Sequence, residues 1–543
     1  MSAISYRKFL PRGQLYALVN TGTVREELRR CNWPPLMHYD PWVAQEAVFE
    51  MDAQKICGSR PREENSDITS ASIGEKSYRK VLATLLLMGE APKIRDLVKE
   101  DVCDDDLPLV RCVGKWSDKS IDKFDEHQWT VSTPFFAEGV RNNVPHQVFE
   151  PQTILPFLLW KISESSSNGG CSRVYKVHIH PDHRAFSHHG NEYVAVKELK
   201  SQNWDDFRQE VSILKRVSGN FHLHLISLLA TYEHSGRYHL IFPWAKADLR
   251  EYWKTFSGDG NPPKGPETIC WLAEQCHGLA DGLSLIHRYY ARSISGDSLA
   301  DRNSGSGQLL FGRHGDIKPA NILWFPGDDC REEDGGVPHG VLKLADFGIA
   351  QLSDKDKVTT QVPFPSSRPY RAPETKSRPM TLSTLYDVWS LGCVYLEFVA
   401  WYFGGWASVE AFMEQRSKDP ADRSESQERQ AETTGDTFFQ ILRGDERSEM
   451  TPQVHPAVDA FIDEAHDPTH NPYYTEFFHD FLVLIRQHML IAEQMGRYRR
   501  SSSAEVAAKL AEMLTRCKSE PGSYLAANLR ISSWRVGGEE LLG

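Results

Sequence analysis

The chain has 543 residues, of which 40% are hydrophobic and 25% are charged, a composition typical of globular proteins. A formal net charge of −12 without a long lysine or arginine block argues against a dedicated nucleic-acid-binding protein and against a polybasic membrane anchor. No apolar run approaches the ~20 residues of a membrane-spanning helix, and the first residues do not resemble a secretory signal. The 10 cysteines include no Cys-x-x-Cys pair, so we expect no zinc site and a reducing, cytoplasmic or nuclear, location.

Residues 1–150 carry none of the chemistry found later, and we expect them to form a mainly helical N-terminal region of unknown role. The polar stretch Ser59–Lys80 is typical of a loop or linker. Apolar residues then recur with helical spacing over Val81–Met88 and continue to Val98. This pattern predicts a buried helix, but the sequence does not distinguish a structural helix from a docking or regulatory element.

From about Ile154 the chain changes to short β-rich runs, five of which predict strands. The amphipathic segment Trp204–Val217 predicts one helix after the third strand, and from Leu249 onward the pattern is mainly helical. We therefore expect an α+β fold of two lobes, a small lobe built on a five-stranded antiparallel sheet with one helix, and a larger α-helical lobe. The predicted strands are Leu155–Ile162, Arg173–His180, Glu192–Lys197, Leu225–Tyr232 and Tyr238–Phe242.

Three polar or charged segments interrupt the second half of the chain. They are Ala291–Gln308, Gly327–Gly340 and Glu414–Met450. Their composition predicts solvated surface loops, partly disordered.

The segment His314–Leu323 places an acid, Asp316, five residues before an amide, Asn321, and a second acid follows at Asp346 in Ala345–Gly348. Asp316 would accept or orient the proton of a substrate hydroxyl. The amide oxygen of Asn321 and the carboxylate of Asp346 are the hard ligands that Mg²⁺ prefers. Ordinary surface acids beside a β-hairpin are the alternative explanation. That explanation would be sufficient for an isolated Asp346, but the upstream motif with Asp316 and Asn321 makes it improbable.

These two loops resemble the catalytic and metal-binding loops of eukaryotic protein kinases of the serine/threonine type. The residues around Asp346 and those of the segment Phe242–Leu249 also resemble the expanded kinase families of filamentous fungi. The resemblance implies a bilobal kinase fold that binds ATP and Mg²⁺, with Lys318 near the γ-phosphate. It further implies that Lys197, which ends the run Val194-Ala195-Val196-Lys197, pairs with the α- and β-phosphates. Such a lysine needs an anionic partner, and Glu210 on the following helix is the candidate.

The family's glycine-rich phosphate loop is incomplete here. Counting back from Val174 puts Ser167, Gly169 and Ser172 at the three glycine positions, and Gly170 adds a glycine beside the middle one. Glycines let backbone amides approach phosphates closely. The resemblance therefore predicts phosphate cover by this loop, with a lowered affinity for ATP.

The resemblance places adenine against a hinge segment, Phe242–Leu249. It implies that Val174 and Ala195 contact the nucleotide, as does Phe242, the bulky residue at the back of the pocket. The family uses the carbonyl of Pro243, which proline retains, and both backbone groups of Ala245. Asp248 matches the residue that binds the ribose. It could equally cap the helix that begins at Leu249, and the two roles are compatible.

The segment Arg368–Glu374 resembles the end of a kinase activation loop, and Ser367 stands where the family usually has a threonine. Asp387 resembles the aspartate that caps the backbone of the catalytic loop. Arg500 resembles the late arginine that pairs with Glu374, because a buried carboxylate needs such a partner. Arg497 and Arg499 are alternatives for that role.

The main departure from the family is Gly315, which replaces the arginine that precedes the catalytic aspartate and binds a phosphorylated activation loop. We therefore expect activity not to depend on phosphorylation of Thr359 or Thr360.

Overall, the sequence predicts a kinase domain over residues 151–516 and a C-terminal tail over 517–543. Its expected partners are protein substrates with serine or threonine hydroxyls, and neither nucleic acid nor membrane. The alternative is a pseudokinase that acts as a scaffold or an ATP-binding module, and phosphorylation of a small molecule is a weaker possibility.

Overall fold

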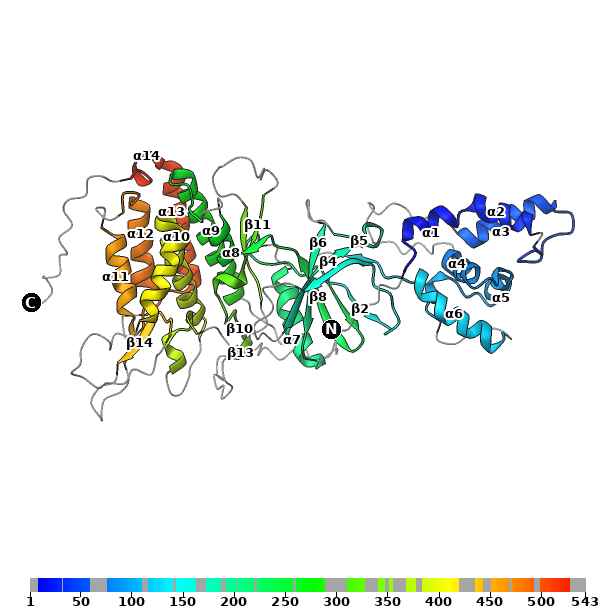
Figure 1. The fold of residues 1–543 in the computed structure, drawn as a ribbon, viewed down its shortest axis with the longest axis horizontal. Helices are drawn as coiled ribbons and strands as arrows, with labels where there is room; N and C mark the ends of the chain where they lie inside the picture. Colours follow the sequence, from blue (N-terminus) through cyan, green and yellow to red (C-terminus); the bar gives the residue numbers. More distant parts are fainter. Residues whose placement is uncertain are drawn as a thin grey trace, which may run out of the picture. The chain divides into compact units, whose positions relative to one another are not determined.

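The computed structural model divides the chain into two compact units (Figure 1). Unit 1 comprises residues 1–140, 144–202 and 229–244, and unit 2 comprises 141–143, 203–228 and 245–543. The residues that the structure describes are 8–31, 33–58, 76–109, 116–139, 143–162, 172–186, 192–201, 203–218, 222–256, 260–288, 310–327, 340–346, 351–354, 368–376, 383–418, 435–442, 451–467, 471–492 and 499–527.

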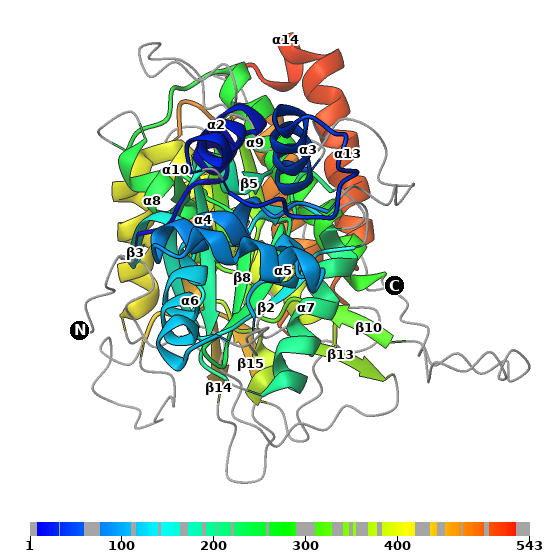
Figure 2. The ribbon, with the colours of Figure 1, turned by 90° about the vertical axis from the view of Figure 1, so that its right-hand side faces the viewer.

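Unit 1 begins with a helical region around one apolar core, to which Leu28, Ile56, Leu85 and Phe124 contribute. Helices α2 and α3 pack against each other, as do α4 and α6 (Figure 2). The helix expected over Val81–Met88 is present as α4, but it ends at Leu87, and the apolar residues up to Val98 belong to the separate helix α5. The elements are α1 (Arg12–Leu18), α2 (Thr21–Arg30), α3 (Gln45–Cys57), α4 (Arg79–Leu87), η1 (Ala91–Lys93), α5 (Ile94–Lys99), η2 (Asp104–Asp106) and α6 (Asp118–Val131).

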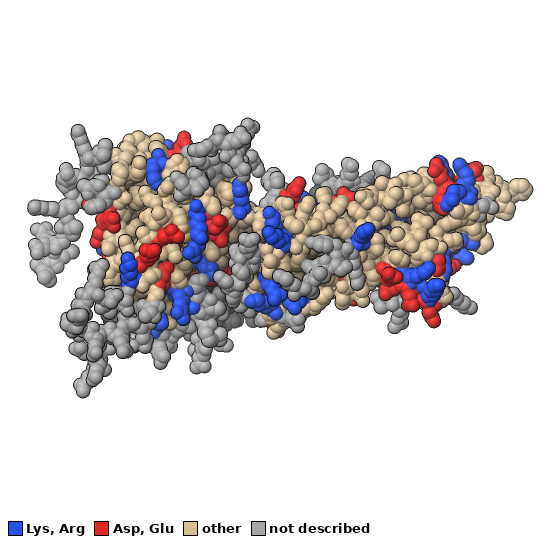
Figure 3. Space-filling model, in the orientation of Figure 1, with Lys and Arg blue, Asp and Glu red and all other residues tan. Residues whose placement is uncertain are grey.

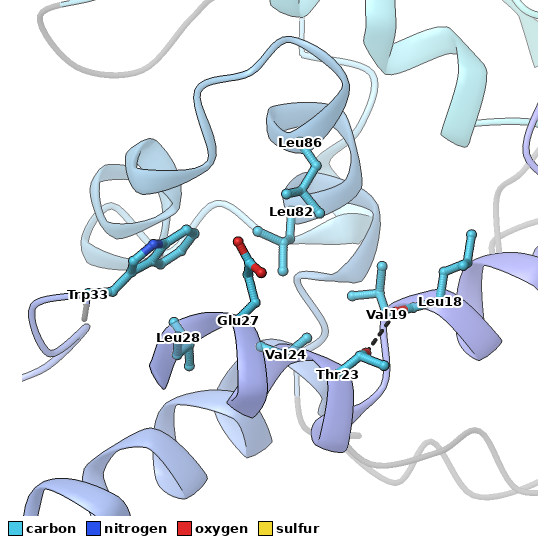
Figure 4. A pocket seen from close by; sticks show the side chains of 9 residues that line it. All are labelled: Leu18, Val19, Thr23, Val24, Glu27, Leu28, Trp33, Leu82 and Leu86. Carbon is cyan, nitrogen blue, oxygen red and sulfur yellow. Dashed lines mark hydrogen bonds between the residues drawn. The ribbon is translucent and has the colours of Figure 1, made fainter. Parts of the chain in front are cut away.

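A pocket of 280 Å³ opens in this helical region (Figure 4). Val24, Leu28 and Leu82 are buried in its wall, whereas Leu18 and Leu86 are largely exposed beside it. Glu27 is the ionisable side chain in its lining. None of the residues predicted for phosphoryl transfer lines this pocket.

The helical region is fastened to the rest of unit 1 at η4 (Pro181–His183), beside the short parallel pair β1 (Phe136–Ala137) and β5 (Arg184–Ala185). The backbone N–H of Arg12 donates to His183 Nε2 at 3.1 Å, and that of Gly13 donates to Asp182 Oδ2 at 2.9 Å. A Cβ at Gly13 would lie 2.6 Å from Asp182 Oδ2, so only glycine permits this approach.

The main sheet of unit 1 has six strands in the order β2-β7-β8-β6-β4-β3. Five are antiparallel neighbours, as expected, and β2 adds a parallel partner for β7 that the sequence analysis missed. Strand β2 is short and Val148 on it is 70% exposed, so it lacks the alternating burial that marks a strand in a sequence. The strands are β2 (His146–Phe149), β3 (Phe157–Ile162), β4 (Ser172–Ile179), β6 (Tyr193–Leu199), β7 (Ala230–His234) and β8 (Arg237–Pro243).

Two expectations about the small lobe need correction. The fourth strand begins at Ala230 rather than at Leu225, and helix α7 (Trp204–Ser218), expected in the small lobe, groups with unit 2. The segment after α7 explains both, because Ile226 N–H donates to the carbonyl of Leu344 at 2.9 Å and Leu344 N–H donates to that of His224 at 2.8 Å. The continuous apolar run from Leu225 therefore contains both a segment that pairs with Leu344 in unit 2 and the start of strand β7 in unit 1. The spacing of its apolar residues does not show where the first ends and the second begins.

Unit 2 is built around α10, whose first half is buried on all sides. Helix α9 packs along α13. Its helices are α8 (Leu249–Thr255), α9 (Pro266–His287), α10 (Leu385–Ser417, kinked at Gly404 and Gly405), α11 (Pro456–Ala465), α12 (Glu476–Leu484), the π-helix η8 (Ile485–Met489), α13 (Ser503–Ser519) and α14 (Pro521–Tyr524), with 3-10 turns η5 (Pro319–Asn321) and η6 (Pro373–Lys376).

Unit 2 also contains short antiparallel strands that flank its loops. Strand β11 pairs with β12 and β9, β10 pairs with β13, and β14 pairs with β15. They are β9 (Ala247–Asp248), β10 (Leu310–Arg313), β11 (Ile322–Phe325), β12 (Val341–Leu344), β13 (Gln351–Asp354), β14 (Phe439–Leu442) and β15 (Thr451–Val454).

The segment Glu414–Met450 differs from the expected solvated loop at its two ends. Arg416 lies in the last turn of α10 and is 1% exposed, and Phe438 is fully buried. The guanidinium of Arg416 lies 4.1 Å from the Phe412 ring centroid and 4.0 Å from that of Phe438, which lets a charged residue enter an apolar core. The segment 291–308 and most of 327–340 lie outside the described residues.

The surface carries both signs of charge. On the face drawn in Figure 3, acidic and basic side chains are intermixed over the described residues of each unit. Among the described helices, none is both long and apolar enough to cross a membrane.

Candidate active site

The loop between β10 and β11 brings three of the predicted site residues together. Asp316 is buried, and its Oδ2 accepts hydrogen bonds from Lys318 Nζ at 2.7 Å and from Asn321 Nδ2 at 3.0 Å. Asn321 Nδ2 also donates to the carbonyl of Asp316 at 2.8 Å. The 3-10 turn η5 folds Asn321 back toward Asp316. A carboxylate held by two donors keeps one orientation, which a group that positions a hydroxyl requires.

Asp387, near the start of α10, holds the backbone of this loop. Its carboxylate accepts the backbone N–H groups of His314 and Gly315 and also His287 Nε2, each at 2.8 Å. Burial by itself would raise the pKa of this carboxyl, but the hydrogen bond from His287 and the proximity of His314 hold the pKa of Asp387 below its ordinary value. The predicted capping of the catalytic loop by Asp387 is confirmed.

Gly315 fits the backbone conformation of this loop. Its φ of 84° lies in the left-handed region, where a side chain costs roughly 1–2 kcal/mol and glycine adopts the conformation without strain. Its N–H can therefore reach Asp387 at no conformational cost. The exchange of arginine for glycine removes a guanidinium but leaves the hydrogen bonds to Asp387 in place.

Arg313 is a buried residue beside the loop that the sequence analysis did not single out. It ends β10 and is 6% exposed. Burial lowers the pKa of its guanidinium, and the negative charge of Asp387 opposes this shift. Its position directly before His314 is the only signal that the sequence offers.

Asp346 follows β12 and is tied to the same loop through its neighbour. The N–H of Ala345 donates to the carbonyl of Asn321 at 2.9 Å, and His314 Nε2 lies 3.0 Å from the carbonyl oxygen of Ala345. Asp346 is exposed, with a φ of 64° that is uncommon for a residue other than glycine. Such backbone conformations concentrate at functional sites. Phe347 and Gly348 lie outside the described residues.

The donor chemistry of Asn321 and Asp346 fits a magnesium ion. The amide nitrogen of Asn321 is used on Asp316, so its amide oxygen is the atom that remains for a cation. Mg²⁺ commonly binds through one or two protein oxygens together with substrate phosphates and water. Within the described residues, no group of three or more His, Cys, Asp or Glu side chains is arranged to hold a metal ion.

The lysine predicted to bind phosphates belongs to unit 1. Lys197 on β6 is 8% exposed and lies opposite Val174 of β4, just as Ala195 lies opposite Lys176. Residues opposite each other in a sheet share a face, so Val174, Ala195 and Lys197 lie on one side. Glu210 is half-buried on α7 and belongs to unit 2, so its ion pair with Lys197 stays a prediction. The glycine-rich loop, with Gly169 and Gly170, lies outside the described residues.

The hinge segment crosses from one unit to the other. Phe242 and Pro243 end β8 opposite Ala195 and Val194, and Ala245 begins the next part of unit 2. Asp248 Oδ1 accepts the N–H of Glu251 at 2.9 Å, which confirms its role as the N-cap of α8. Burial raises the pKa of this carboxyl. The roles of these residues toward adenine and ribose stay predictions.

Arg500 is the partner of Glu374. Its NH1 and NH2 contact the two carboxylate oxygens of Glu374 at 2.7 and 2.8 Å, and the guanidinium is fully buried. It also donates to the carbonyls of Leu385 and Ile491. Of the two alternatives, Arg499 is exposed and Arg497 lies outside the described residues. This bidentate pair anchors Glu374, at the end of the predicted activation segment, within unit 2.

The sequence did not predict a second buried network, which includes Tyr370, a few residues before Glu374. Tyr370 Oη donates to Glu397 at 2.9 Å, and Arg416 contacts Glu397 and Asp436 at 2.8 Å each. Arg416 and Asp436 belong to the segment Glu414–Met450, whose many charged residues predicted a solvated loop. The composition of this segment therefore gave no indication of their part in a buried network. Ser367, Thr359 and Thr360 lie outside the described residues.

Comparison with known proteins finds a family match over the region that contains the candidate site. The family model "Protein kinase domain" matches residues 312–463, which include the catalytic loop, Asp346, Glu374 and Asp387. The chain is 28% identical over 230 residues to "Cyclin-dependent kinase 4" of Ovis aries, covering 40% of this chain and 61% of that protein.

Two yeast relatives give shorter matches. The chain is 39% identical over 87 residues to "Glycogen synthase kinase-3 homolog YGK3" of Saccharomyces cerevisiae, covering 16% of this chain and 20% of that protein. It is 28% identical over 219 residues to a serine/threonine-protein kinase of the same yeast, covering 35% and 26%. The chain thus spans less than two thirds of each of these relatives. Together with the family match, these likenesses show that the chain contains a protein kinase domain and is similar to eukaryotic protein kinases.

Proposed function

We propose that this chain is a protein kinase that transfers the γ-phosphate of ATP, with Mg²⁺, to serine or threonine hydroxyls of protein substrates. The observation that carries the proposal is the arrangement of Asp316, whose carboxylate is held by Lys318 and Asn321 in a loop that is joined to the residue before Asp346.

In this proposal Asp316 accepts a hydrogen bond from the substrate hydroxyl and takes its proton as the oxygen attacks the γ-phosphorus, while the bond between the γ-phosphorus and the bridging oxygen breaks and ADP leaves. Such general base catalysis contributes about 10²–10⁴ in rate. Lys318, which contacts Asp316 Oδ2 at 2.7 Å, would place positive charge beside the γ-phosphate as negative charge develops there. Asp387 keeps the loop backbone in place while the proton moves.

Several of the predicted residues would hold the phosphates. Asn321 and Asp346 would bind Mg²⁺, which would neutralise negative charge on the phosphate oxygens. Lys197 would pair with the α- and β-phosphates, with Glu210 as its partner. Val174, Ala195, Phe242, Pro243, Ala245 and Asp248 would enclose the adenosine, and the loop with Gly169 and Gly170 would cover the phosphates.

Serine or threonine as the acceptor is supported by Lys318, which resembles a residue of serine/threonine kinases, and by the yeast relative whose printed name is that of a serine/threonine-protein kinase. We propose a catalytic domain over 151–516. Strand β2 and helix α14 lie just outside these bounds, and Tyr524 is fully buried with its hydroxyl on Asp480, so packed structure extends past both. The roles of residues 1–150 and of the tail 517–543 stay open.

The alternative function is a pseudokinase scaffold. Its support is Gly315 and the unusual glycine-rich loop. Gly315 is weaker support for a pseudokinase than the sequence alone suggests, because its φ of 84° favours glycine and its N–H still donates to Asp387. The metal-binding and proton-accepting groups would not be needed in a scaffold.

The proposal is tested by incubating the chain with γ-labelled ATP and a generic protein substrate, followed by phosphoamino-acid analysis. We expect label on serine and threonine, lost when EDTA removes Mg²⁺ and restored when Mg²⁺ is returned. Label on tyrosine alone would contradict the acceptor class. ATP binding without any transfer would favour the scaffold.

A further inference from the structure

Lys176 of β4 lies between two aromatic rings in unit 1. Its Nζ is 4.0 Å from the ring centroid of Tyr193 and 5.2 Å from that of Trp244. Tyr193 begins β6, and Trp244 directly follows β8, so three neighbouring strands of the sheet contribute to the contact. An ammonium group is attracted to the face of an aromatic ring, most strongly to that of tryptophan. We call these three residues the cation–π clamp.

The clamp lies on the face of the sheet that carries the proposed nucleotide-binding residues. Lys176 is paired with Ala195 across the β4–β6 ladder, and Val174 is paired with Lys197. Paired residues, and residues two apart on a strand, point to the same face. Lys176 and Tyr193 therefore extend the row of Val174, Ala195 and Lys197 by one position along the strands.

Trp244 connects the clamp to the hinge segment. It is the last residue of unit 1, between Pro243 and Ala245, whose backbone groups are proposed to hold adenine. Pro243 is fixed in the sheet opposite Val194, whereas Ala245 already belongs to unit 2. Trp244 therefore lies where the backbone leaves the sheet, and the contact of its ring with Lys176 ties the backbone to the sheet at that point. Holding this ring restricts the backbone torsions on both sides of it.

We propose that Lys176 is a positioning residue for nucleotide binding: by holding Trp244 against the sheet, it fixes the hinge peptides that receive adenine. The proposal rests on the proposed ATP-dependent function and adds to it a determinant of ATP affinity. Lys176 does not act on the phosphates in this account. Its loss therefore weakens ATP binding and leaves the rate of transfer at saturating ATP nearly unchanged.

The experiment compares Lys176→Met, which keeps the aliphatic stem but removes the charge, with Lys176→Arg, which keeps the charge. Lys254→Met is the matched control, because Lys254 Nζ lies 5.0 Å from the ring of Trp406 in unit 2 and outside the clamp. Amide hydrogen exchange of residues 244–246 is measured without nucleotide, and the Kd for Mg-ATP, KM for ATP and kcat are measured alongside.

We expect faster exchange at residues 244–246 and about a three- to tenfold rise in Kd and KM for ATP in Lys176→Met, the range set by a cation–π contact at a partly buried site. Lys176→Arg should stay near the wild type, and Lys254→Met should leave exchange and Kd unchanged. Trp244→Leu should reproduce Lys176→Met, and the double variant should be no weaker than either single one.

Unchanged exchange and unchanged Kd in a folded Lys176→Met protein would overturn the proposal. So would a fall in kcat with KM unchanged, or an equal loss of affinity in Lys176→Arg. If Lys176→Met does not fold, Trp244→Leu answers the same question. A wild-type chain that binds no ATP would overturn both this proposal and the proposed function, whereas transfer by the wild type with no effect of Lys176→Met overturns this proposal alone.

Discussion

The side-chain amide of Asn321 donates two hydrogen bonds to Asp316, one to its carbonyl at 2.8 Å and one to its carboxylate at 3.0 Å. The proposed metal ligand is therefore also a support for the proposed general base. A change at either residue should disturb both functions, because the two groups share one hydrogen-bonded loop.

Asn321→Ala should lower the rate of phosphate transfer by about 10² or more, since it removes a metal oxygen and the donor that orients Asp316. The Mg²⁺ concentration for half-maximal rate should rise as well. Asn321→Asp is the informative companion, because it keeps an oxygen ligand but loses the N–H donor. Full wild-type rates for Asn321→Ala at saturating Mg²⁺ would show that the hydrogen bonds to Asp316 are dispensable.

Asp387 should make the stability of unit 2 sensitive to acid. Its pKa is held below its ordinary value of 3.8, so its contribution is fully present above that value and is lost as the pH falls through the lower pKa of the folded state. Asp387→Ala leaves two loop N–H groups and His287 without their acceptor, and should cost about 3–5 kcal/mol at neutral pH.

Thermal midpoints of wild type and Asp387→Asn, measured from pH 7 to pH 3, check this account. The difference between the two proteins should be largest at neutral pH and should shrink as the pH falls below 3.8, because the unfolded chain then takes up a proton that folded Asp387 takes up only at lower pH. A difference that stays constant to pH 3 would mean that the charge of Asp387 is not what stabilises the loop.

Gly315→Arg should cost about 1–2 kcal/mol of stability, because φ at this position is 84°. It should also create a dependence of activity on phosphorylation of Thr359 or Thr360, since it returns a phosphate-binding guanidinium to the loop. Gly315→Ala imposes the backbone strain without the guanidinium and serves as the control. The measurement is the transfer rate before and after phosphatase treatment.

The wild type should be insensitive to phosphatase and to Thr359→Ala/Thr360→Ala. A near-complete loss of wild-type rate after either treatment would contradict the account of Gly315. In that event buried Arg313, directly upstream, becomes the first residue to test.

Gly278→Ala should destabilise unit 2 by about 1–3 kcal/mol, although alanine is the better helix former by roughly 1 kcal/mol. A Cβ at 278 would lie 2.1 Å from the ring of His224, which is buried and bonded to the carbonyl of Leu342 at 2.8 Å. The urea midpoint of unfolding measures the loss.

Gly282→Ala, one turn further along α9, is the matched control. Its Cβ would lie 3.0 Å from His222 Nδ1 and 3.0 Å from Leu225 Cδ2, a milder overlap than the 2.1 Å at position 278. The loss at Gly278 should therefore exceed that at Gly282, and the reverse order would contradict the packing of His224.

The local chemistry of the site follows from the sequence because short-range motifs determine it. Asp316, Lys318 and Asn321 lie in one short loop between β10 and β11. The pairing of Arg500 with Glu374 is different, because 126 positions separate them. It was predicted only through the family pattern, and three nearby arginines competed for the role.

The errors concern tertiary context. Strand β2 has little buried surface of its own, and only its pairing with β7 reveals it. Arg416 and Asp436 are charged residues, so their place in the core depends on Glu397 and two phenylalanine rings that no local pattern indicates. The division of the run from Leu225 to His234 between the two units likewise depends on Leu344 and its distant strand.

The most direct test of the central claim is phosphate transfer from γ-labelled ATP by the wild type and by Asp316→Asn, with the Kd for Mg-ATP measured for both. Asparagine keeps the shape of Asp316 but cannot accept the proton. We predict transfer by the wild type, a loss of about 10²–10⁴ in Asp316→Asn, and nearly equal Kd values. Equal transfer rates in the two proteins, or ATP binding by both with transfer by neither, would contradict the account.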